Sequence, residues 1–600
     1  MNLRERLSSF AEALCLFLFF ATFVAIVVLI GGTRMAFSLP CYIVLGAAGL
    51  LALLRLRAAK PRPCSVCLVI TTLVFAYLIA RAWMSPAPYI ARSDLYSALA
   101  ALVVYLGFAL IFTNGTGRMA FLIGLLLLAV VQVFIGAIQF RDGNNFMPIS
   151  WIQRYDYGNR ASGFYGCPNH LAGMLEVVGI IALSIACWSR WPVWAKLLVG
   201  YGAVSCYVGV IITGSRGGYL STMASLAVFG LLSLLVLRRA TPRLFWTISS
   251  LGAVAAVVLG GVVMFSFARS HFLTSRAQAM FETKDIRLPL WRAALPQWQL
   301  KPLIGTGSAT YLYYGRYFRE ESVQRDPVYV HSDYLQLLAE YGIIGAVGVG
   351  LLIVAHLRNG GRAFARLGPK RVAVSQHLFS NGLALNIGAL AALAAYAVHE
   401  ALDFNLHIPA NALLMAFVFG ILANDGVTRN REVPPVSWPG MLWRVAFAGL
   451  SLLLLVQSAR LLPGEYWAER ARTAVRDEQP GVGIVNATRG LRFDPANPQL
   501  YYYLGSARLQ LGDSAGHPDA AASYYGDAVA AFEKARELAP LDTIYALELA
   551  TTLDLAGRFE EAEWRFHEAM KLDPKSDSLR RYYEGHLKQW TAATSVPAQS

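Results

Sequence analysis

Apolar runs long enough to cross a lipid bilayer recur along most of this chain, and they constrain its fold more than any other feature. Of the 600 residues, 56% are hydrophobic and 15% are charged, and the mean hydropathy is +0.46. This composition is too apolar for an ordinary soluble protein, and a membrane helix needs roughly 20 apolar residues. We therefore predict an all-α, polytopic membrane bundle of about thirteen helices. The predicted spans are 10–31, 36–54, 65–83, 96–113, 119–140, 170–188, 195–213, 217–237, 245–267, 333–356, 381–399, 405–423 and 441–461.

Basic residues are unevenly divided between the loops, which predicts the orientation of the bundle. Alternate short loops are rich in arginine and lysine, and such loops face the cytoplasm. The N-terminus is therefore expected inside, and the first run is expected to remain as a span rather than to be removed as a signal peptide. The two long loops at 141–169 and 268–332 and the segment from 465 onward would lie outside. The formal net charge of +15 follows largely from this asymmetry, so nucleic acid is not an expected partner.

The composition changes after residue 464, where apolar runs give way to charged, helix-forming sequence. Similar segments end at Pro495, Pro540 and Pro574, and the last interval is 34 residues. This period resembles the tetratricopeptide repeat, so we predict a membrane domain at 1–464 and a periplasmic helical repeat domain at 465–600. An 11-residue insertion, SAGHPDAAASY, is expected to widen a loop between two helices. Two uses stay open: a surface that docks a peptide or an envelope protein, and a spacer that packs on the membrane domain.

Polar residues at the outer ends of the predicted spans are the candidates for function, because ionisable groups near a bilayer must be paired, hydrated or used. The segment 158–175, GNRASGFYGCPNHLAGML, holds Arg160, Asn169 and His170 among glycines and a proline. Irregular backbone at this depth is tolerated when it is buried in protein or lines a cavity. The segment therefore predicts a pocket wall. The alternative is an ordinary re-entrant turn in which His170 caps a helix.

A second segment, ITGSRGGYL at 211–219, places Arg216 among glycines in a hairpin between two spans. A guanidinium beside exposed backbone N–H groups at a helix start is suited to a phosphate. The alternative is an arginine that extends to lipid headgroups.

The long outer loop supplies two more cations. Arg287 and Arg292 flank Trp291, and several tyrosines follow. Cationic groups beside aromatic rings suit a substrate that carries both phosphate and sugar. An interfacial aromatic belt is the alternative.

His331 stands at the start of the apolar run 333–356. Ser332 or Asp333 is expected to cap the helix and to fix the neighbouring backbone. A neutral imidazole at this position can remove a proton from a hydroxyl group at the membrane surface. Taken alone, such a residue is more often a helix-end histidine than a base.

Taken in order, these segments resemble the O-antigen ligase and polymerase superfamily. The blocks that carry the resemblance are NRASGFYGCPNHLAGML, TGSRGGYL, RLPLWRAAL with PLIGTG, HSDYLQLLAEYGIIG and HEALDFNLHIPANALL. The resemblance implies a GT-C-like, inverting, metal-independent glycosyltransferase of the bacterial inner membrane. Its donor would be a glycan on undecaprenyl diphosphate, and its active site would lie between the long periplasmic loop and the bilayer.

The resemblance also implies roles for individual residues. Arg216 and Arg287 would bind the diphosphate and stabilise its departure, and His331 would orient or deprotonate the acceptor hydroxyl. Arg292 competes with Arg287 for its role because both flank the same tryptophan, and Ser332 stands where the commoner form of the motif has asparagine. The expected substrate-binding residues are Arg160, Asn169, His170, Trp291, Arg292 and Tyr334.

Metal chemistry is the main rival within these motifs. His399, Asp403 and His407 recur every four residues and would share one face of a continuous helix. Asp403 replaces the second histidine of a zinc motif, however, and Pro409 is expected to interrupt the helix. We therefore expect neither a metal nor a cofactor, and we expect Glu400 and Asp403 to support the neighbouring pocket.

The motifs do not determine the acceptor. A glycan acceptor would make the protein an O-antigen or exopolysaccharide polymerase, a lipid core would make it a ligase, and a protein would make it an O-oligosaccharyltransferase. Export of the repeats favours the polymerase. Two interpretations without catalysis also stay open: a transporter or flippase, which predicts charged groups near mid-membrane, and a scaffold for envelope assembly.

Overall fold

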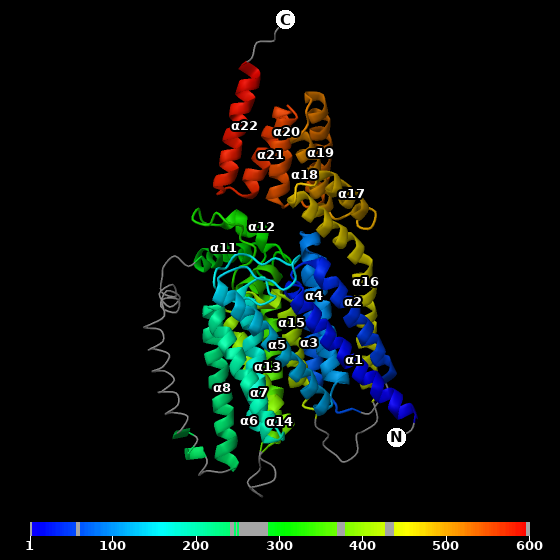
Figure 1. Ribbon diagram of the computed structural model, residues 1–600, viewed down its shortest axis with the longest axis vertical. Helices are drawn as coiled ribbons and strands as arrows, with labels where there is room; N and C mark the ends of the chain where they lie inside the picture. The colour runs from blue at the N-terminus through cyan, green and yellow to red at the C-terminus, as the bar shows by residue number, and fades with distance from the viewer. Residues whose placement is uncertain are drawn as a thin grey trace.

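The computed structural model describes residues 3–55, 60–240, 245–247, 249–250, 286–368, 379–426 and 437–595. Within these ranges every regular element is a helix, and a smaller helical domain stands at one end of a long bundle (Figure 1). The helices of the bundle are α1 (Leu3–Val28), α2 (Met35–Leu51), α3 (Ser65–Trp83), α4 (Pro88–Leu106), α5 (Gly115–Asp142), α6 (Pro168–Trp188), α7 (Val193–Thr213), α8 (Arg216–Ala240), α13 (Asp333–Leu367), α14 (Asn381–His399), α15 (Pro409–Ala423) and α16 (Trp438–Arg476).

Eleven of the described helices are long and apolar enough to cross a membrane. They correspond to eleven of the predicted spans, so the prediction of an all-α membrane bundle is confirmed. The shorter α15 corresponds to a twelfth, although it begins at Pro409 rather than at residue 405 because proline favours the first position of a helix. The predicted span at 245–267 lies outside the described residues except at its first few positions.

The bundle is organised around α4 and α6. Of the residues in their most apolar windows, 89% in α4 and 83% in α6 are buried, against 28% in α3 and 22% in α8. Helices that are apolar on all sides and surrounded by protein form the centre, and the more exposed helices face the lipid. α16 packs closely on α2, where a Cβ on Gly46 would lie 2.7 Å from the carbonyl oxygen of Ser451. Small residues permit this close approach of two membrane helices.

The described part of the long loop before α13 is fixed to the start of that helix. α13 is broken at Gly342, whose φ of 67° and ψ of −170° are not helical. The segment 302–307 lies against the break, and the N–H of Thr306 donates to the carbonyl oxygen of Ala339 at 3.1 Å. A Cβ on Gly305 would lie 2.2 Å from a backbone carbon of α13, so this contact requires glycine. The loop also forms two helices that cover this end of the bundle, α11 (Arg287–Leu300) and α12 (Tyr311–Phe318) (Figure 1).

The C-terminal helices form helix-turn-helix units like those of tetratricopeptide repeats. α16 continues past the predicted division at residue 464 into this domain without a break. The units pack through small and large side chains, and Ala550, Ala562 and Phe566 are at most 1% exposed. The insertion was expected to widen a loop, but this is wrong: its alanine-rich part lengthens a helix because alanine favours helix. The repeat helices are α17 (Pro480–Leu491), α18 (Pro498–Asp513), α19 (Pro518–Leu538), α20 (Thr543–Leu555), α21 (Phe559–Leu572) and α22 (Asp577–Ser595).

Buried ion pairs hold the repeats on the end of the bundle that lies opposite the start of α1 (Figure 1). Arg319, which follows α12, bonds to Asp573 at 2.7 Å, and the two side chains are 2% and 6% exposed. Arg92 of α4 pairs with Asp494 in the same interface. The repeats therefore pack on the membrane domain, and docking of a further protein stays a prediction.

Arg319→Met is expected to loosen this interface. The substitution leaves Asp573 buried without its cation, at a cost on the order of 3 kcal/mol. Hydrogen exchange of α12 and α21 in the full-length protein should increase, while that of α6 should not change. The matched control is Arg558→Met, which removes an exposed pair with Glu561 and should cost less than about 1 kcal/mol. Equal rates of hydrogen exchange in α12 and α21 of the two variants would contradict the proposal that Arg319 holds the repeats on the membrane domain.

Candidate functional site

A chain of hydrogen bonds joins separate segments at the end of the bundle that carries the repeats. Nδ1 of His331 lies 3.3 Å from Oδ1 of Asp403, and the other carboxylate oxygen accepts from Nδ2 of Asn169 at 2.5 Å. Arg160 donates to Oδ1 of Asn169 at 2.7 Å and to the carbonyl oxygen of Thr213 at 2.9 Å. The network therefore brings together four of the predicted motif segments, 158–175, 211–219, 331–345 and 399–414.

His331 is held in a backbone conformation that residues other than glycine rarely adopt. Its φ is 55°, and such strain persists only where the surroundings enforce it. Trp291 donates to its carbonyl oxygen at 3.4 Å, and the N–H of Asp333 donates to the carbonyl oxygen of Asp403. The imidazole meets the ring of Phe404 edge on, with 4.8 Å between centroids. Because 33% of the side chain stays exposed, the imidazole is accessible to a substrate.

Asp403 is the buried anion of this network, with a side chain that is 1% exposed. Burial raises the pKa of Asp403, but the hydrogen bond and the charge of His331 outweigh burial and hold this pKa below its usual range. The carboxylate is therefore charged at neutral pH and accepts a hydrogen bond from the Nδ1–H group of His331. Nε2 then remains as the basic nitrogen of the imidazole.

The expected capping of α13 by Ser332 or Asp333 is wrong. Ser332 occupies the N-cap position, but its side chain makes no capping hydrogen bond. The carboxylate of Asp333 turns to the facing loop, where it accepts from the N–H of Leu406 at 3.0 Å and lies 2.7 Å from Nδ1 of His407. A bond between a carboxylate and an imidazole is stronger than a bond to a neutral backbone group, so the loop is preferred to the helix end.

The rival set of His399, Asp403 and His407 does not converge on one point. α14 ends at His399, and the α-helix is interrupted before α15, with only a short 3-10 helix, η4 (Asn405–His407), between them. This is the interruption that the sequence predicted. His399 faces a glutamate of α6, Asp403 faces His331, and His407 faces Asp333. The three residues therefore share no helix face on which to hold a zinc ion.

Glu176 is a site residue that the motifs did not single out. It lies about two turns into α6, where its carboxylate is 3.0 Å from Nδ1 of His399 and accepts from the hydroxyl of Ser221. The sequence could have indicated this residue, because Glu176 is an acidic residue inside an apolar run and an ionisable group in a span requires a partner. A transporter also predicts charges of this kind. Here the two side chains of the pair are at most 1% exposed and are bonded to each other.

Arg216 is the first residue of α8. Gly214 precedes it with a φ of 61°, a left-handed conformation that reverses the chain after α7. A Cβ on Gly217 would lie 2.9 Å from the ring of His399, and Gly218 approaches α6 equally closely. Gly217 and Gly218 therefore allow α8 to pack closely on its neighbouring helices, rather than allowing a ligand to approach. The contact with His399 places the start of α8 at the same end of the bundle as the hydrogen-bond network.

α11 begins at Arg287 and carries Trp291 to the network. The charge of Arg287 is close enough to act on His399, which the start of α8 also contacts. Arg292 lies on the other side of the helix, paired with Glu320 at 3.1 Å and with 68% of its side chain exposed. Of the two arginines that flank the tryptophan, Arg287 is therefore the one near the buried histidine.

The irregular segment before α6 is held by two glutamines of α5. Gln139 accepts from the backbone N–H groups of Ser162 and Gly163, and Gln132 accepts from that of Phe164. The backbone N–H groups of this segment have no partner within a helix, and the glutamine side chains satisfy them in a region close to the membrane. The irregular backbone that the glycines predicted is present, and its conformation is set by long-range contacts.

His170 does not cap a helix, as the re-entrant-turn interpretation required. It is 5% exposed, and neither ring nitrogen has a hydrogen-bond partner. Its ring meets Phe404 edge on with 5.0 Å between centroids. His170 and His331 therefore contact the same aromatic ring.

Residues 201–350 match the sequence profile of the Wzy_C family, described as O-Antigen ligase. The predicted resemblance to the O-antigen ligase family is confirmed. The matched region contains Arg216, Arg287 and His331. Among solved structures, the chain is similar to a thermophilic TPR protein of Thermus thermophilus, with 19% sequence identity, a TM-score of 0.20, and coverage of 26% of this chain and 88% of that chain. Comparison with curated proteins gives no match.

The O-antigen ligase match points to an enzyme of that type, which acts on glycans at a membrane. The apolar helices of the described residues fit a multi-pass protein of the bacterial inner membrane. Within the O-antigen ligase region, Tyr334 lines an apolar cavity of about 250 Å³ between α3, α4, α13, α14 and α15. Its hydroxyl donates to the carbonyl oxygen of Ala397 at 2.8 Å. The lining of the cavity also includes Asp333, which is two residues from His331 along the chain.

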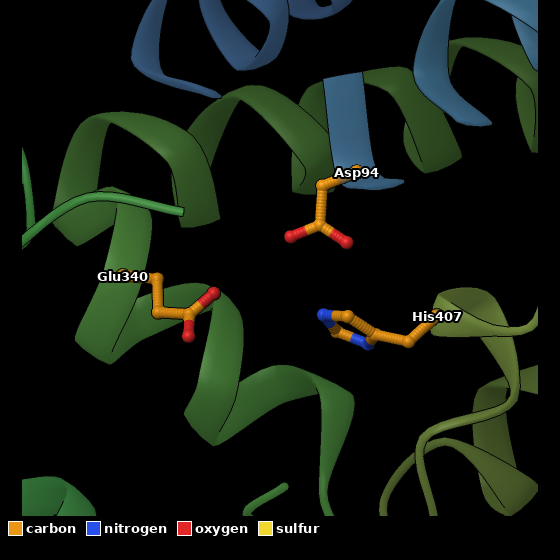
Figure 2. A group of neighbouring side chains, drawn as sticks. All are labelled: Asp94, Glu340 and His407. Carbon is orange, nitrogen blue, oxygen red and sulfur yellow. The ribbon is translucent and has the colours of Figure 1, made fainter. Parts of the chain in front are cut away.

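Figure 2 shows a cluster beside this cavity, formed by Asp94, Glu340 and His407, which point toward one another. The polar atoms of the three side chains lie within 4.8 Å of one another, and such a donor set is used by metal ions. Burial lowers the pKa of His407, but the charge and hydrogen bond of Asp333 outweigh burial and raise this pKa to about 10. The imidazolium thus supplies a positive charge beside the carboxylates of Asp94, Asp333 and Glu340.

Asp403→Asn should reduce turnover on the order of 100-fold, because the amide no longer holds the imidazole of His331 in one tautomer and orientation. The measurement is kcat for glycan transfer, and KM for the donor should change less than kcat. Asp142→Asn is the matched control, since it alters only an exposed pair with Arg141 and should keep wild-type turnover. An Asp403→Asn protein with wild-type kcat would contradict the assigned contact.

The same variant should alter the response to acid. Because the pKa of Asp403 is depressed in the folded protein, its ionised form stabilises the fold above the unfolded-state pKa of about 4, and this contribution is lost as the pH falls below about 4. Wild-type protein should therefore lose more Tm between about pH 6 and about pH 3 than Asp403→Asn does. Parallel curves in a thermal unfolding experiment would argue against a depressed pKa.

Proposed function

We propose that this protein transfers a glycan from undecaprenyl diphosphate to an acceptor hydroxyl at the outer face of the inner membrane. The observation that carries the proposal is the network in which Asp403 orients an exposed imidazole, His331, at the end of the bundle where α8 and α11 begin with arginines. The distribution of basic loops supports placing this end outside the cytoplasm. The match to the O-antigen ligase family supports the same class of chemistry.

In the proposed reaction, His331 acts on the acceptor. Because Nδ1 of His331 is hydrogen-bonded to Asp403, Nε2 is the nitrogen that receives the proton of the acceptor hydroxyl. As this proton leaves, the hydroxyl oxygen of the acceptor attacks the anomeric carbon of the donor. The bond from this carbon to the diphosphate oxygen breaks, and its electron pair leaves with the lipid diphosphate. Attack from the face opposite the leaving group inverts the anomeric carbon.

Arg216 and Arg287 are proposed to bind the diphosphate. Both stand at helix starts, where the positive end of the helix dipole also favours an anion. Two guanidinium groups supply positive charge that stabilises the diphosphate as it leaves, so the proposed mechanism is independent of a metal. The apolar cavity beside Tyr334 offers space for part of the prenyl chain.

The proposed acceptor is a growing glycan, which makes the protein a polymerase for O-antigen or exopolysaccharide. The repeats support this choice, because they cover the same end of the bundle as the catalytic network (Figure 1). Purified full-length protein should convert a lipid-diphosphate oligosaccharide alone into a ladder of longer products. Single transfer that requires an added lipid core or protein would identify a ligase or an O-oligosaccharyltransferase instead. Absence of transfer to every acceptor, with intact protein, would contradict the proposed function.

Arg216→Ala and Arg287→Ala should each lower kcat about 100-fold, which corresponds to about 3 kcal/mol of lost stabilisation of the leaving diphosphate. His331→Ala should lower it at least as much. Arg292→Ala is the matched control, because its side chain is exposed and paired with Glu320, and it should retain activity within about threefold. A larger loss in Arg292→Ala than in Arg287→Ala would reverse the assignment of the second arginine.

A further inference from the structure

A second cavity, of about 290 Å³, lies between the repeats and the membrane domain. One wall comes from α12 and the start of α4, and the other comes from α18, α20 and the turn between α19 and α20. The cavity is thus built by both domains and exists only because the repeats are docked. Neither the family match nor the catalytic network accounts for it.

Tyrosine is the residue that most characterises the lining of this cavity. Five tyrosines face it, two from the membrane domain and three from the repeats, and the rings of two repeat tyrosines pack with centroids 5.3 Å apart. Tyrosine combines a flat apolar face with a hydroxyl that donates and accepts hydrogen bonds. The five residues are Tyr89, Tyr313, Tyr502, Tyr503 and Tyr545.

Polar groups accompany the rings. Arg316 is 2% exposed; its Nε donates to Asp326 at 2.9 Å, while its Nη1 has no hydrogen-bond partner and lies 3.5 Å from Asp542. A buried guanidinium nitrogen without a hydrogen bond is uncommon, and it lines the cavity. Across the cavity, Oε1 of Gln499 accepts from Tyr89 at 3.1 Å, which leaves the amide nitrogen of Gln499 as a donor.

We propose that this cavity binds a segment of the glycan on which the enzyme acts, at a site separate from the catalytic network. The C–H faces of a sugar ring pack on tyrosine rings, and its hydroxyl groups accept from Arg316 and Gln499 and donate to Asp542. The choice of a glycan rests on the proposed function, because that function supplies a sugar polymer at this end of the bundle. The cavity would hold the polymer during successive additions.

The shape of the cavity favours a glycan over a protein partner. Repeats of this kind dock proteins through an open concave surface, whereas here α12 and the start of α4 close the space on the membrane side. A volume of about 290 Å³ is at the lower end of the range for small-molecule sites, and it is too small for a helix of a partner.

The cavity is also physically connected to the catalytic end. α12 lines it through Tyr313, and the neighbouring Tyr311 is fully buried and donates to the carbonyl oxygen of Leu290 in α11 at 2.8 Å. α11 in turn carries Trp291, which bonds to His331. A glycan held against α12 is therefore held on the layer of helices that covers the catalytic histidine.

The test measures binding of glycan to the full-length protein in detergent. The probe is the soluble polysaccharide released by mild acid from the lipid carrier of the cells that make this protein, and binding is followed by calorimetry. Ala539→Trp fills the cavity without removing a polar contact, and it should raise Kd at least tenfold. Gln499→Leu removes one donor together with the acceptor of the Tyr89 hydroxyl, and it should raise Kd about fivefold. Unchanged Tm in both variants shows that the fold is kept.

Two matched controls lie on α22, which contributes no residue to the lining of the cavity. Ala592→Trp and Tyr582→Ala change exposed positions and should bind as wild type does. Wild-type binding that is weakened only by the two cavity variants supports the proposal. No binding to wild type, equal binding by all five proteins, or binding of a peptide library in place of the polysaccharide overturns it. His331→Ala separates this proposal from the proposed function, because it should abolish transfer and keep the wild-type Kd.

Discussion

The contact between the buried carboxylate of Asp403 and the imidazole of His331 is the interaction on which the rest of the site depends. A buried carboxylate is costly unless it is hydrogen-bonded, and Asp403 meets this requirement through Asn169 and His331 together. Asn169 is held in turn by Arg160, which is anchored to the end of α7. Polar bonds therefore help to fix the irregular loops of this end, together with the contacts of Phe404 with His170 and His331. The strained backbone of His331 is one consequence, since only such a network enforces it.

Charges are arranged in layers around this contact. Arg216 and Arg287 stand at the starts of α8 and α11, whereas Asp94, Asp333 and Glu340 lie on the side of the apolar cavity, around the imidazolium of His407. Cations at helix starts suit a ligand with negative charge. The carboxylates of Asp94, Asp333 and Glu340 would repel an anionic ligand. A diphosphate would therefore be favoured near Arg216 and Arg287 rather than near the apolar cavity.

The repeats complete the end of the bundle that holds the hydrogen-bond network, rather than extending freely from it. Their buried ion pairs with the membrane domain, such as Arg319 with Asp573, desolvate charges that would remain hydrated if the domain moved independently. Docking creates the tyrosine-lined cavity and covers α12 at the same time. The repeat period alone resembles that of a protein-docking module. In the folded protein, these repeats form one wall of the tyrosine-lined cavity.

Several features could be predicted from the sequence because they depend on local chemistry. The spans follow from the length of the apolar runs, and the interruption before α15 follows from Pro409. The motif segments found in the sequence include the four that the hydrogen-bond network joins. Other predictions failed where a distant partner competed with a local one. Asp333 was expected to cap its own helix, yet it bonds to a loop that lies more than 70 residues away, and Glu176 escaped notice because its partner, His399, lies in another helix.

The sequence by itself determined that this chain is a helical membrane protein with a repeat domain and a set of cations and histidines at span ends, because hydrophobicity, period and helix signals are properties of neighbouring residues. Only the tertiary structure decided which of these groups meet. Asp403 bonds to residues 72 and 234 positions away, and such pairings depend on how α6, α13 and α14 pack. The packing also decided that Arg292 pairs with Glu320 and stays exposed, a partnership between α11 and a later loop that the motif alone did not indicate.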